Sequence, residues 1–120
     1  MEPKEKVMNT GQKGEAIAEM YLTKLGYEIL ERNFRSRFGE LDLVARHQNV
    51  IIFVEVKTRT TIRQGLPCEA VNREKQHRLR RMARYYLMTT GQSAEACRMD
   101  VIEIILQGNS TLIRQITDAF

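Results

Sequence analysis

Residues 40–57, ELDLVARHQNVIIFVEVK, decide the fold of this 120-residue chain. The apolar run at residues 50–54 is mostly β-branched, which is typical of a strand that is covered on both faces. Residues 40–46 are also strand-like, and the polar residues 47–49 between the two runs predict a tight turn. The stretch therefore predicts a hairpin whose second strand is buried on both sides.

The rest of the chain predicts two helices and three further strands. The helices are expected at residues 10–25, ended by Gly26, and from residue 68 or 70 to residue 90. Each helix has an apolar stripe at helical spacing. The strands are expected at residues 27–35, 99–106 and 111–116. The stripes are Ala18, Tyr21, Leu22 and Leu25 in the first helix, and Val71, Leu79, Met82, Ala83 and Tyr86 in the second.

The resulting order, α-β-β-β-α-β-β, favours an α/β fold with helices packed against a mixed sheet. Three consecutive strands with short turns predict an antiparallel meander, and the second helix supplies a crossover to the fourth strand. Residues 1–9 have no periodicity and are interpreted as a flexible tail. Residues 10–120 are interpreted as a single domain, because a chain of this length rarely divides further.

Composition limits the classes of protein. No apolar run approaches the ~20 residues of a membrane-spanning helix, and the first residues lack the apolar stretch of a secretory signal. Cys68 and Cys97 have no spacing typical of a zinc site or a disulfide framework, and we expect reduced packing residues of a cytoplasmic protein. Nineteen Lys and Arg against 15 Asp and Glu give a net charge of +4, which favours a polyanion partner.

The hairpin also predicts a cluster of charges. If the turn is centred between residues 48 and 49, residues whose numbers sum to 97 face one another. Asp42 then lies opposite Glu55, and Glu40 opposite Lys57, all on one face of the sheet. Opposed Cβ atoms are about 4.5–5.5 Å apart, and like charges at that distance are destabilising. Magnesium would compensate two carboxylates, and Lys57 would hold an attacking water or stabilise charge on a phosphate.

Two alternatives accompany this interpretation. An odd-length loop would place Val54 or Val56 opposite Asp42, and a surface hairpin would merely pair Glu40 with Lys57 at ~0–1 kcal/mol. A third carboxylate, Glu15, lies at the margin of the first helix's stripe and leans toward the sheet. Its alternative role is that of a first-turn acid favoured by the helix dipole.

The motifs GE at residues 14–15, RNFRSRFGELD at 32–42, FVEVKTR at 53–59 and GLPCEAVNREK at 65–75 resemble the YraN-like bacterial family. That family is assigned to the restriction-endonuclease-like, PD-(D/E)xK superfamily, and is distantly similar to archaeal Holliday-junction resolvases. The resemblance implies a restriction-endonuclease-like core with a magnesium site at one edge of the sheet. Its acidic pair falls on Asp42 and Glu55, its lysine on Lys57 and the resolvase-type glutamate on Glu15. The namesake proline is Leu41 here, as is common in the resolvase-like branch.

These residues imply a metal-dependent endonuclease acting on DNA, including branched or repair intermediates. Asp42 and Glu55 would hold Mg²⁺ or Mn²⁺, Lys57 would orient the attacking water, and Glu15 would bind a metal water or a second ion. Because the carboxylates must be ionised, we expect activity to rise from acid toward neutral pH. The alternative function is a non-catalytic nucleic-acid-binding module, or an adaptor that retains the nuclease fold.

Basic residues around the predicted site would contact nucleic-acid phosphates, which position a substrate without reading its sequence. Plain solvated arginine is the alternative for each of the loop positions. Resolvase-like nucleases cut two strands with paired sites, so the resemblance also suggests a homodimer. The basic residues are Arg35 and Arg37 before the Asp42 strand, Arg59 and Arg63 in a predicted polar loop at residues 58–67, and Lys75 in the second helix.

Overall fold

The computed structural model describes residues 8–60 and 71–120. The predicted order of elements is confirmed. Of the predictions made above, most of the N-terminal tail, Arg63 and Cys68 lie outside the described residues. The elements are α1 (Thr10–Lys24), β1 (Glu28–Ser36), β2 (Gly39–His47), β3 (Val50–Arg59), α2 (Arg73–Thr90), β4 (Ala96–Gln107) and β5 (Ser110–Ile116).

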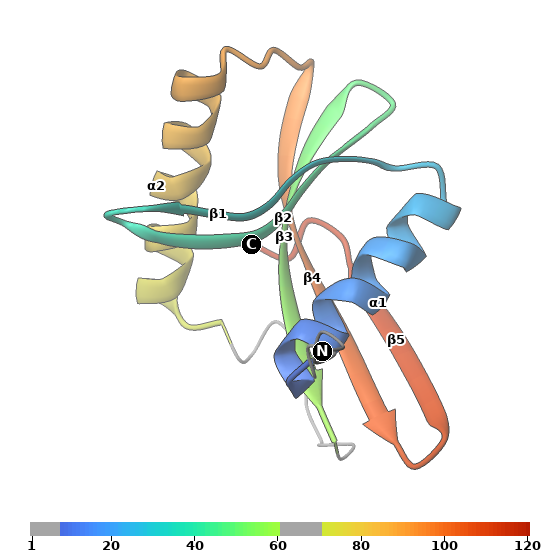
Figure 1. Cartoon of the computed structure of the whole chain (residues 1–120). Coiled ribbons are helices and arrows are strands. Elements are labelled where there is room, and N and C mark those ends of the chain that lie inside the picture. Colours follow the sequence, from blue (N-terminus) through green and yellow to red (C-terminus); the bar gives the residue numbers. More distant parts are fainter. Residues whose placement is uncertain (1–7, 61–70) are drawn as a thin grey trace, which may run out of the picture.

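The strands form one mixed sheet in the order β1-β2-β3-β4-β5. All neighbours pair antiparallel except β3 and β4, which run parallel. The α2 helix lies in the connection between these two parallel strands and makes the crossover (Figure 1). The predicted α/β fold, an antiparallel meander plus a crossover strand with flanking helices, is therefore confirmed.

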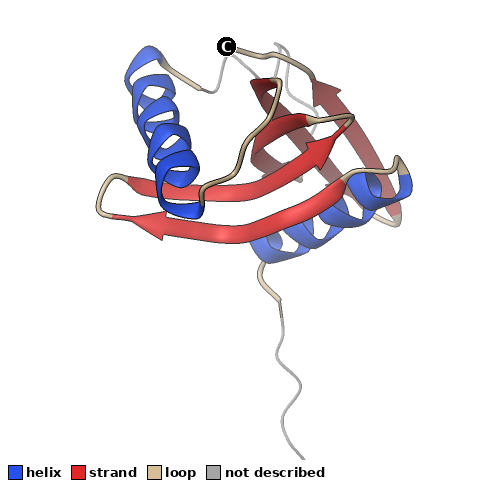
Figure 2. Cartoon of the chain, turned by 90° about the horizontal axis from the view of Figure 1, so that it is seen from above, coloured by secondary structure: helices blue, strands red, loops and turns tan. Residues whose placement is uncertain are grey.

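The two helices cover opposite faces of the sheet (Figure 2). Beneath α2, Ile51 and Phe53 join the core that includes Tyr86, while Ile52 and Val54 join the core beneath α1. Strand β3 thus buries alternate side chains in two separate cores, as its unbroken apolar run predicts.

The turn between β2 and β3 sets the register of the hairpin. Gln48 and Asn49 have positive φ angles of 51° and 62°, as a two-residue type I′ turn requires. Paired residues sum to 97 from His47–Val50 as far as Leu43–Val54. The register predicted from the sequence is confirmed over these pairs, and the odd-length loop is wrong.

Helix α1 begins at Thr10, as predicted, whereas the end of the predicted tail and the start of α2 differ from the predictions. Asn9, the last residue of the predicted tail, caps α1 in a reciprocal capping box with Gln12. Helix α2 begins at Arg73, with Asn72 as its N-cap, rather than at residue 68 or 70.

Cys97 is exposed and is not the packing residue expected. Neither described helix is long and apolar enough to cross a membrane.

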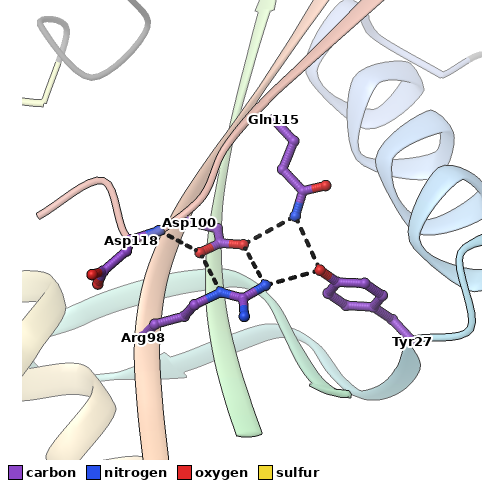
Figure 3. Close-up of polar contacts among 5 residues, drawn as sticks. All are labelled: Tyr27, Arg98, Asp100, Gln115 and Asp118. Atoms are coloured by element: carbon purple, nitrogen blue, oxygen red, sulfur yellow. Dashed lines mark hydrogen bonds and ion pairs between the residues drawn. The ribbon is translucent and has the colours of Figure 1, made fainter. Parts of the chain in front are cut away.

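A closed polar network lies where β4 meets the start of β1 and the C-terminal residues (Figure 3). Asp100 is fully buried and accepts hydrogen bonds from Arg98 Nε at 3.0 Å and Nη2 at 3.3 Å, Gln115 Nε2 at 3.0 Å and Asp118 N at 3.0 Å. Arg98 and Gln115 also donate to the Tyr27 hydroxyl. Because its carboxylate is matched by donors, Asp100 ties distant segments together at little electrostatic cost.

Candidate functional site

Asp42 and Glu55 meet where strands β2 and β3 separate. The last backbone pair of β2 and β3, counted away from the turn, is Leu43–Val54. Asp42 and Glu55 are the two residues that directly follow this pair. Backbone pairing stops there, and Asp42 Oδ2 instead accepts a hydrogen bond from Val56 N at 2.8 Å. A carboxylate thus takes the place of a ladder carbonyl and is held against its acidic neighbour.

The position of Asp42 makes its ionised form unfavourable. Burial raises the pKa of Asp42 to about 7, and the Glu55 carboxylate adds to the rise. The hydrogen bond from Val56 N–H opposes both effects without cancelling them. Glu55 is itself 8 % exposed, so solvent screens the pair only weakly. This is the destabilising juxtaposition that the hairpin arithmetic predicts.

Two further carboxylates reach the same place, one from α1 and one from the same strand as Asp42. One oxygen each of Glu15 on α1, Glu40 on β2 and Asp42 lie within 4.8 Å of one another. With its side-chain amide oriented to donate, Asn33 bonds Glu15 Oε2 at 3.1 Å and Glu40 Oε1 at 2.8 Å. Burial raises the pKa of Glu15, and the charge of Glu40 raises it further. The three acids could hold a metal ion.

The close approach of α1 to β3 places Glu15 in this cluster. Gly14 is buried, and a Cβ atom built on it would lie 1.7 Å from Thr58 Oγ1 and 2.9 Å from Thr58 Cβ. Only a residue without a side chain fits between the helix and the strand at this point. The two residues of the GE motif therefore act together. The glycine allows α1 to pack closely against β3, and the glutamate that follows it supplies the carboxylate.

Two lysines contact Glu55. Lys75 Nζ lies 2.7 Å from Glu55 Oε1, and Lys57 Nζ lies 3.4 Å from the same oxygen. Burial, together with the hydrogen bond to Lys75, lowers the pKa of Lys57. Burial would also lower the pKa of Lys75, but the hydrogen bonds with Glu55 and Lys57 and the nearby carboxylate charges together outweigh burial, and the pKa is raised. Among the described ion pairs Glu40 contacts Arg35, at 3.2 Å, so the surface pairing of Glu40 with Lys57 is wrong.

These side chains surround a cavity of about 470 Å³, here called the carboxylate cavity. Its acids come from α1, β2 and β3, its cations come from α2, and its apolar wall comes from α2 and from Phe38 in the turn between β1 and β2. Such a set of hard oxygen donors beside ammonium groups fits a divalent cation and a phosphate. The cavity is lined by Glu15, Phe38, Gly39, Glu40, Asp42, Glu55, Lys75, Arg78, Leu79 and Met82.

The oxygens gathered for a metal differ from the predicted pair of Asp42 and Glu55. The compact set consists of Glu15, Glu40 and Asp42, while Glu55 lies next to Asp42 with its carboxylate on the two lysines. All four predicted residues, including Lys57, are thus within one neighbourhood. Glu40 joins the acids rather than balancing a lysine.

The remaining predicted basic residues fall in different places. Arg37 lies with its guanidinium carbon 4.9 Å from the centre of the Phe38 ring, next to the carboxylate cavity. The prediction that Arg59 lies in a polar loop is wrong, because β3 continues to Arg59 and its Nε lies 3.8 Å from the buried Glu103 Oε2. Arg63 is outside the described residues.

Sequence reasoning missed Asn33 entirely. Asn33 lies in β1 with a positive φ of 49°, a conformation that asparagine tolerates better than most residues. The one feature that could have identified it is its residue type. Asparagine is depleted in strands, so an asparagine inside a predicted strand suggests a special role. Glu40, by contrast, was visible at the correct spacing from Asp42, and only its partner was assigned wrongly.

Comparison with known proteins adds one firm result. The family described as "Uncharacterised protein family UPF0102" matches residues 14–104. The chain is 46% identical over 112 residues to a UPF0102 protein of Clostridium acetobutylicum, covering 92% of each chain. It is 42% identical over 106 residues to one of Caldanaerobacter subterraneus subsp. tengcongensis, covering 88% of this chain and 87% of the relative. The predicted YraN-like membership refers to this same family. The chain belongs to the UPF0102 family.

Proposed function

We propose that this protein is a Mg²⁺- or Mn²⁺-dependent endonuclease that hydrolyses phosphodiester bonds in DNA, with a PD-(D/E)xK type of site. The observation that carries the proposal is the gathering of Glu15, Glu40 and Asp42 within 4.8 Å, beside the nearly buried Glu55. Like charges brought together in this way destabilise the fold unless a cation compensates them. A structural role alone gives no reason to keep all four.

The donor set fits the proposed ion. Magnesium prefers carboxylate oxygens, keeps several waters and completes its shell with substrate phosphate, and a cavity of about 470 Å³ leaves room for both. Glu15, Glu40 and Asp42 would hold the ion. When bound, such an ion polarises a phosphoryl oxygen and lowers the pKa of a bound water.

The lysines have separate roles in this proposal. Lys57 has a lowered pKa because of burial and its neighbour Lys75, so it is suited to orient a water and to accept or return a proton. Lys75 lines the carboxylate cavity directly and keeps a raised pKa through its hydrogen bond with Glu55. It would therefore remain charged and stabilise negative charge on the phosphate.

Two ion pairs of Glu55 favour a second candidate function. Lys57 and Lys75 neutralise Glu55 without a metal ion, and this arrangement would also suit a nucleic-acid-binding module that performs no cleavage. The two candidates differ in what Asp42 is for. A binding module gains nothing from Asp42, whereas a nuclease requires it.

Cleavage assays would separate these candidates. Labelled single-stranded, duplex, flapped and four-way DNA, together with RNA, would be incubated with the protein in Mg²⁺, Mn²⁺ or EDTA. We expect metal-dependent cleavage of DNA that falls at least about 100-fold in Asp42→Ala and Lys57→Ala. Asp118→Asn, purified identically, removes an exposed carboxylate that does not line the cavity and serves as the matched control.

Two results would contradict the proposal. Cleavage that persists in Asp42→Ala would identify a contaminating nuclease. Nucleic-acid binding that is equal in the wild type and Asp42→Ala, with no cleavage by either protein, would establish the binding module instead.

A further inference from the structure

A second hollow lies beside the carboxylate cavity and combines arginines with aromatic rings. Its volume is about 630 Å³, and it is formed by the turn between β1 and β2 and by one side of α2. Two of its apolar side chains are open to solvent, since Tyr85 is 38% exposed and Met88 is 82% exposed. We call it the basic–aromatic groove, and it is lined by Arg37, Phe38, Arg81, Arg84, Tyr85 and Met88.

The Phe38 ring is the centre of the groove. The guanidinium carbons of Arg37 and Arg81 each lie 4.9 Å from its centroid, and the Tyr85 ring lies 6.1 Å away at a steep angle. None of the three groove arginines takes part in an ion pair with a carboxylate among residues 8–60 and 71–120. Positive charge is thus concentrated on flat, partly exposed rings and is left without a carboxylate partner in that part of the chain.

The groove adjoins the carboxylate cavity. Phe38 lines both hollows, and Arg78 of α2 lines the cavity. From Arg78 the positions Arg81, Tyr85 and Met88 follow at spacings of three, four and three residues, which places them on one side of the helix. A ligand chain with a phosphate in the cavity could therefore continue along this side of α2.

We propose that the basic–aromatic groove binds unpaired nucleotides of the DNA strand whose phosphodiester lies in the carboxylate cavity. The preferred substrate then has a single-stranded segment next to the cleavage point. Guanidinium groups match the phosphates, and exposed rings match the faces of unpaired bases. A duplex offers its phosphates but keeps its bases stacked inside, and an acidic peptide would leave the rings unused. The inference rests on the proposed function for the nature of the substrate.

Binding measured in EDTA tests the groove independently of cleavage. The probe is a fluorescein-labelled oligothymidylate of about 20 nucleotides, compared with a duplex of equal length by fluorescence anisotropy. We expect Tyr85→Leu to weaken binding of the single strand about fivefold or more, with little effect on the duplex. Arg81→Ala should weaken binding of the single strand similarly and reduce its salt dependence by roughly 0.7 of a counterion.

Arg80→Ala is the matched control for Arg81→Ala. Arg80 is the adjacent exposed residue of the same helix, but its guanidinium lies over the Phe120 ring outside the groove. We expect the affinity of this variant to stay within about twofold of the wild type. Equal losses in Arg80→Ala and Arg81→Ala would overturn the proposal, because they would indicate unspecific attraction to a basic helix.

Failure of the groove and failure of the nuclease give different results. Groove-dependent binding of single strands without cleavage would remove the proposed function and leave the groove as a binding site. Cleavage that requires Asp42 but is unchanged in Tyr85→Leu and Arg81→Ala on flapped and single-stranded DNA would overturn the groove alone.

Discussion

Asp100 and Asp42 belong to the same sheet but have opposite surroundings. Asp100 accepts four hydrogen bonds and has Arg98 beside it, whereas Asp42 accepts one backbone hydrogen bond and faces other carboxylates. The first arrangement stabilises the fold, and the second lowers the free energy of unfolding. A buried acid therefore indicates function only when the donors expected around it are replaced by further acids.

The largest expected effect breaks the stabilising member of this comparison. Asp100→Ala leaves the Arg98 guanidinium, Gln115 and the Asp118 amide without their shared acceptor. We expect the free energy of unfolding to fall by about 3–5 kcal/mol, measured by urea denaturation. Asp118→Asn keeps the backbone donor and tolerates the positive φ at that position, so it should change stability by less than about 0.5 kcal/mol. Equal stability of Asp100→Ala and the wild type would contradict the role of the network.

The second effect concerns Asp42 and has the opposite sign. Its folded-state pKa of about 7 lies above the ordinary value of 3.8, so the folded protein binds this proton more tightly than the unfolded chain does. In EDTA the free energy of unfolding should therefore fall as pH rises from about 4 to 7, and should be lowest above pH 7. Asp42→Asn should remove most of this slope and be more stable than the wild type by roughly 2–4 kcal/mol at pH 8.

Thermal and urea unfolding between pH 4 and pH 8 would measure this slope. Adding Mg²⁺ at pH 8 should stabilise the wild type and leave Asp42→Asn nearly unchanged, since binding to the folded state alone raises its stability. A wild-type slope identical to that of Asp42→Asn would show that this carboxyl does not titrate as its surroundings require.

The smallest expected effect tests how the helix places Glu15. Gly14→Ala would bring a methyl group against Thr58, and overpacking of this kind costs about 1–3 kcal/mol. Gly11→Ala adds the same group three residues earlier, where its nearest contact is an ordinary 3.5 Å to Asn9 Oδ1. That control should stabilise the helix by up to about 1 kcal/mol. Urea denaturation of both variants gives the comparison, and effects of the same sign would contradict the close approach of α1.

The sequence was sufficient to predict the sheet and much of the site. Period-two and helical patterns placed the elements, and the two-residue turn at Gln48 and Asn49 fixed the register that brings Asp42 to Glu55. These features are local, so a single chain carries them. The start of α2 differs from the prediction because Asn72 caps the helix. Its short polar side chain does not alter the apolar stripe, so the periodicity alone does not mark this boundary.

The details of the cluster could not be predicted in the same way. Glu40 contacts Arg35 because the two residues are paired directly across β1 and β2. Pairing of β2 with β3 stops at Leu43 and Val54, and nothing in the residue pattern marks the place where these two strands separate. The contribution of Asn33 depends on a left-handed backbone conformation inside a strand. Both features are departures of the strands from regular geometry. A register calculated for a flat hairpin does not include such departures.

The parallel pairing of β3 with β4 has a consequence for the order of folding. The antiparallel pairs close over short turns, whereas this pair joins residues on either side of α2 and must wait for a much longer loop to close. Strand β3 gains the partner at its second edge only in that step, and Lys75 lies within the loop that closes. We therefore expect the carboxylate cavity to be completed late, after the acids of the hairpin have already been brought together.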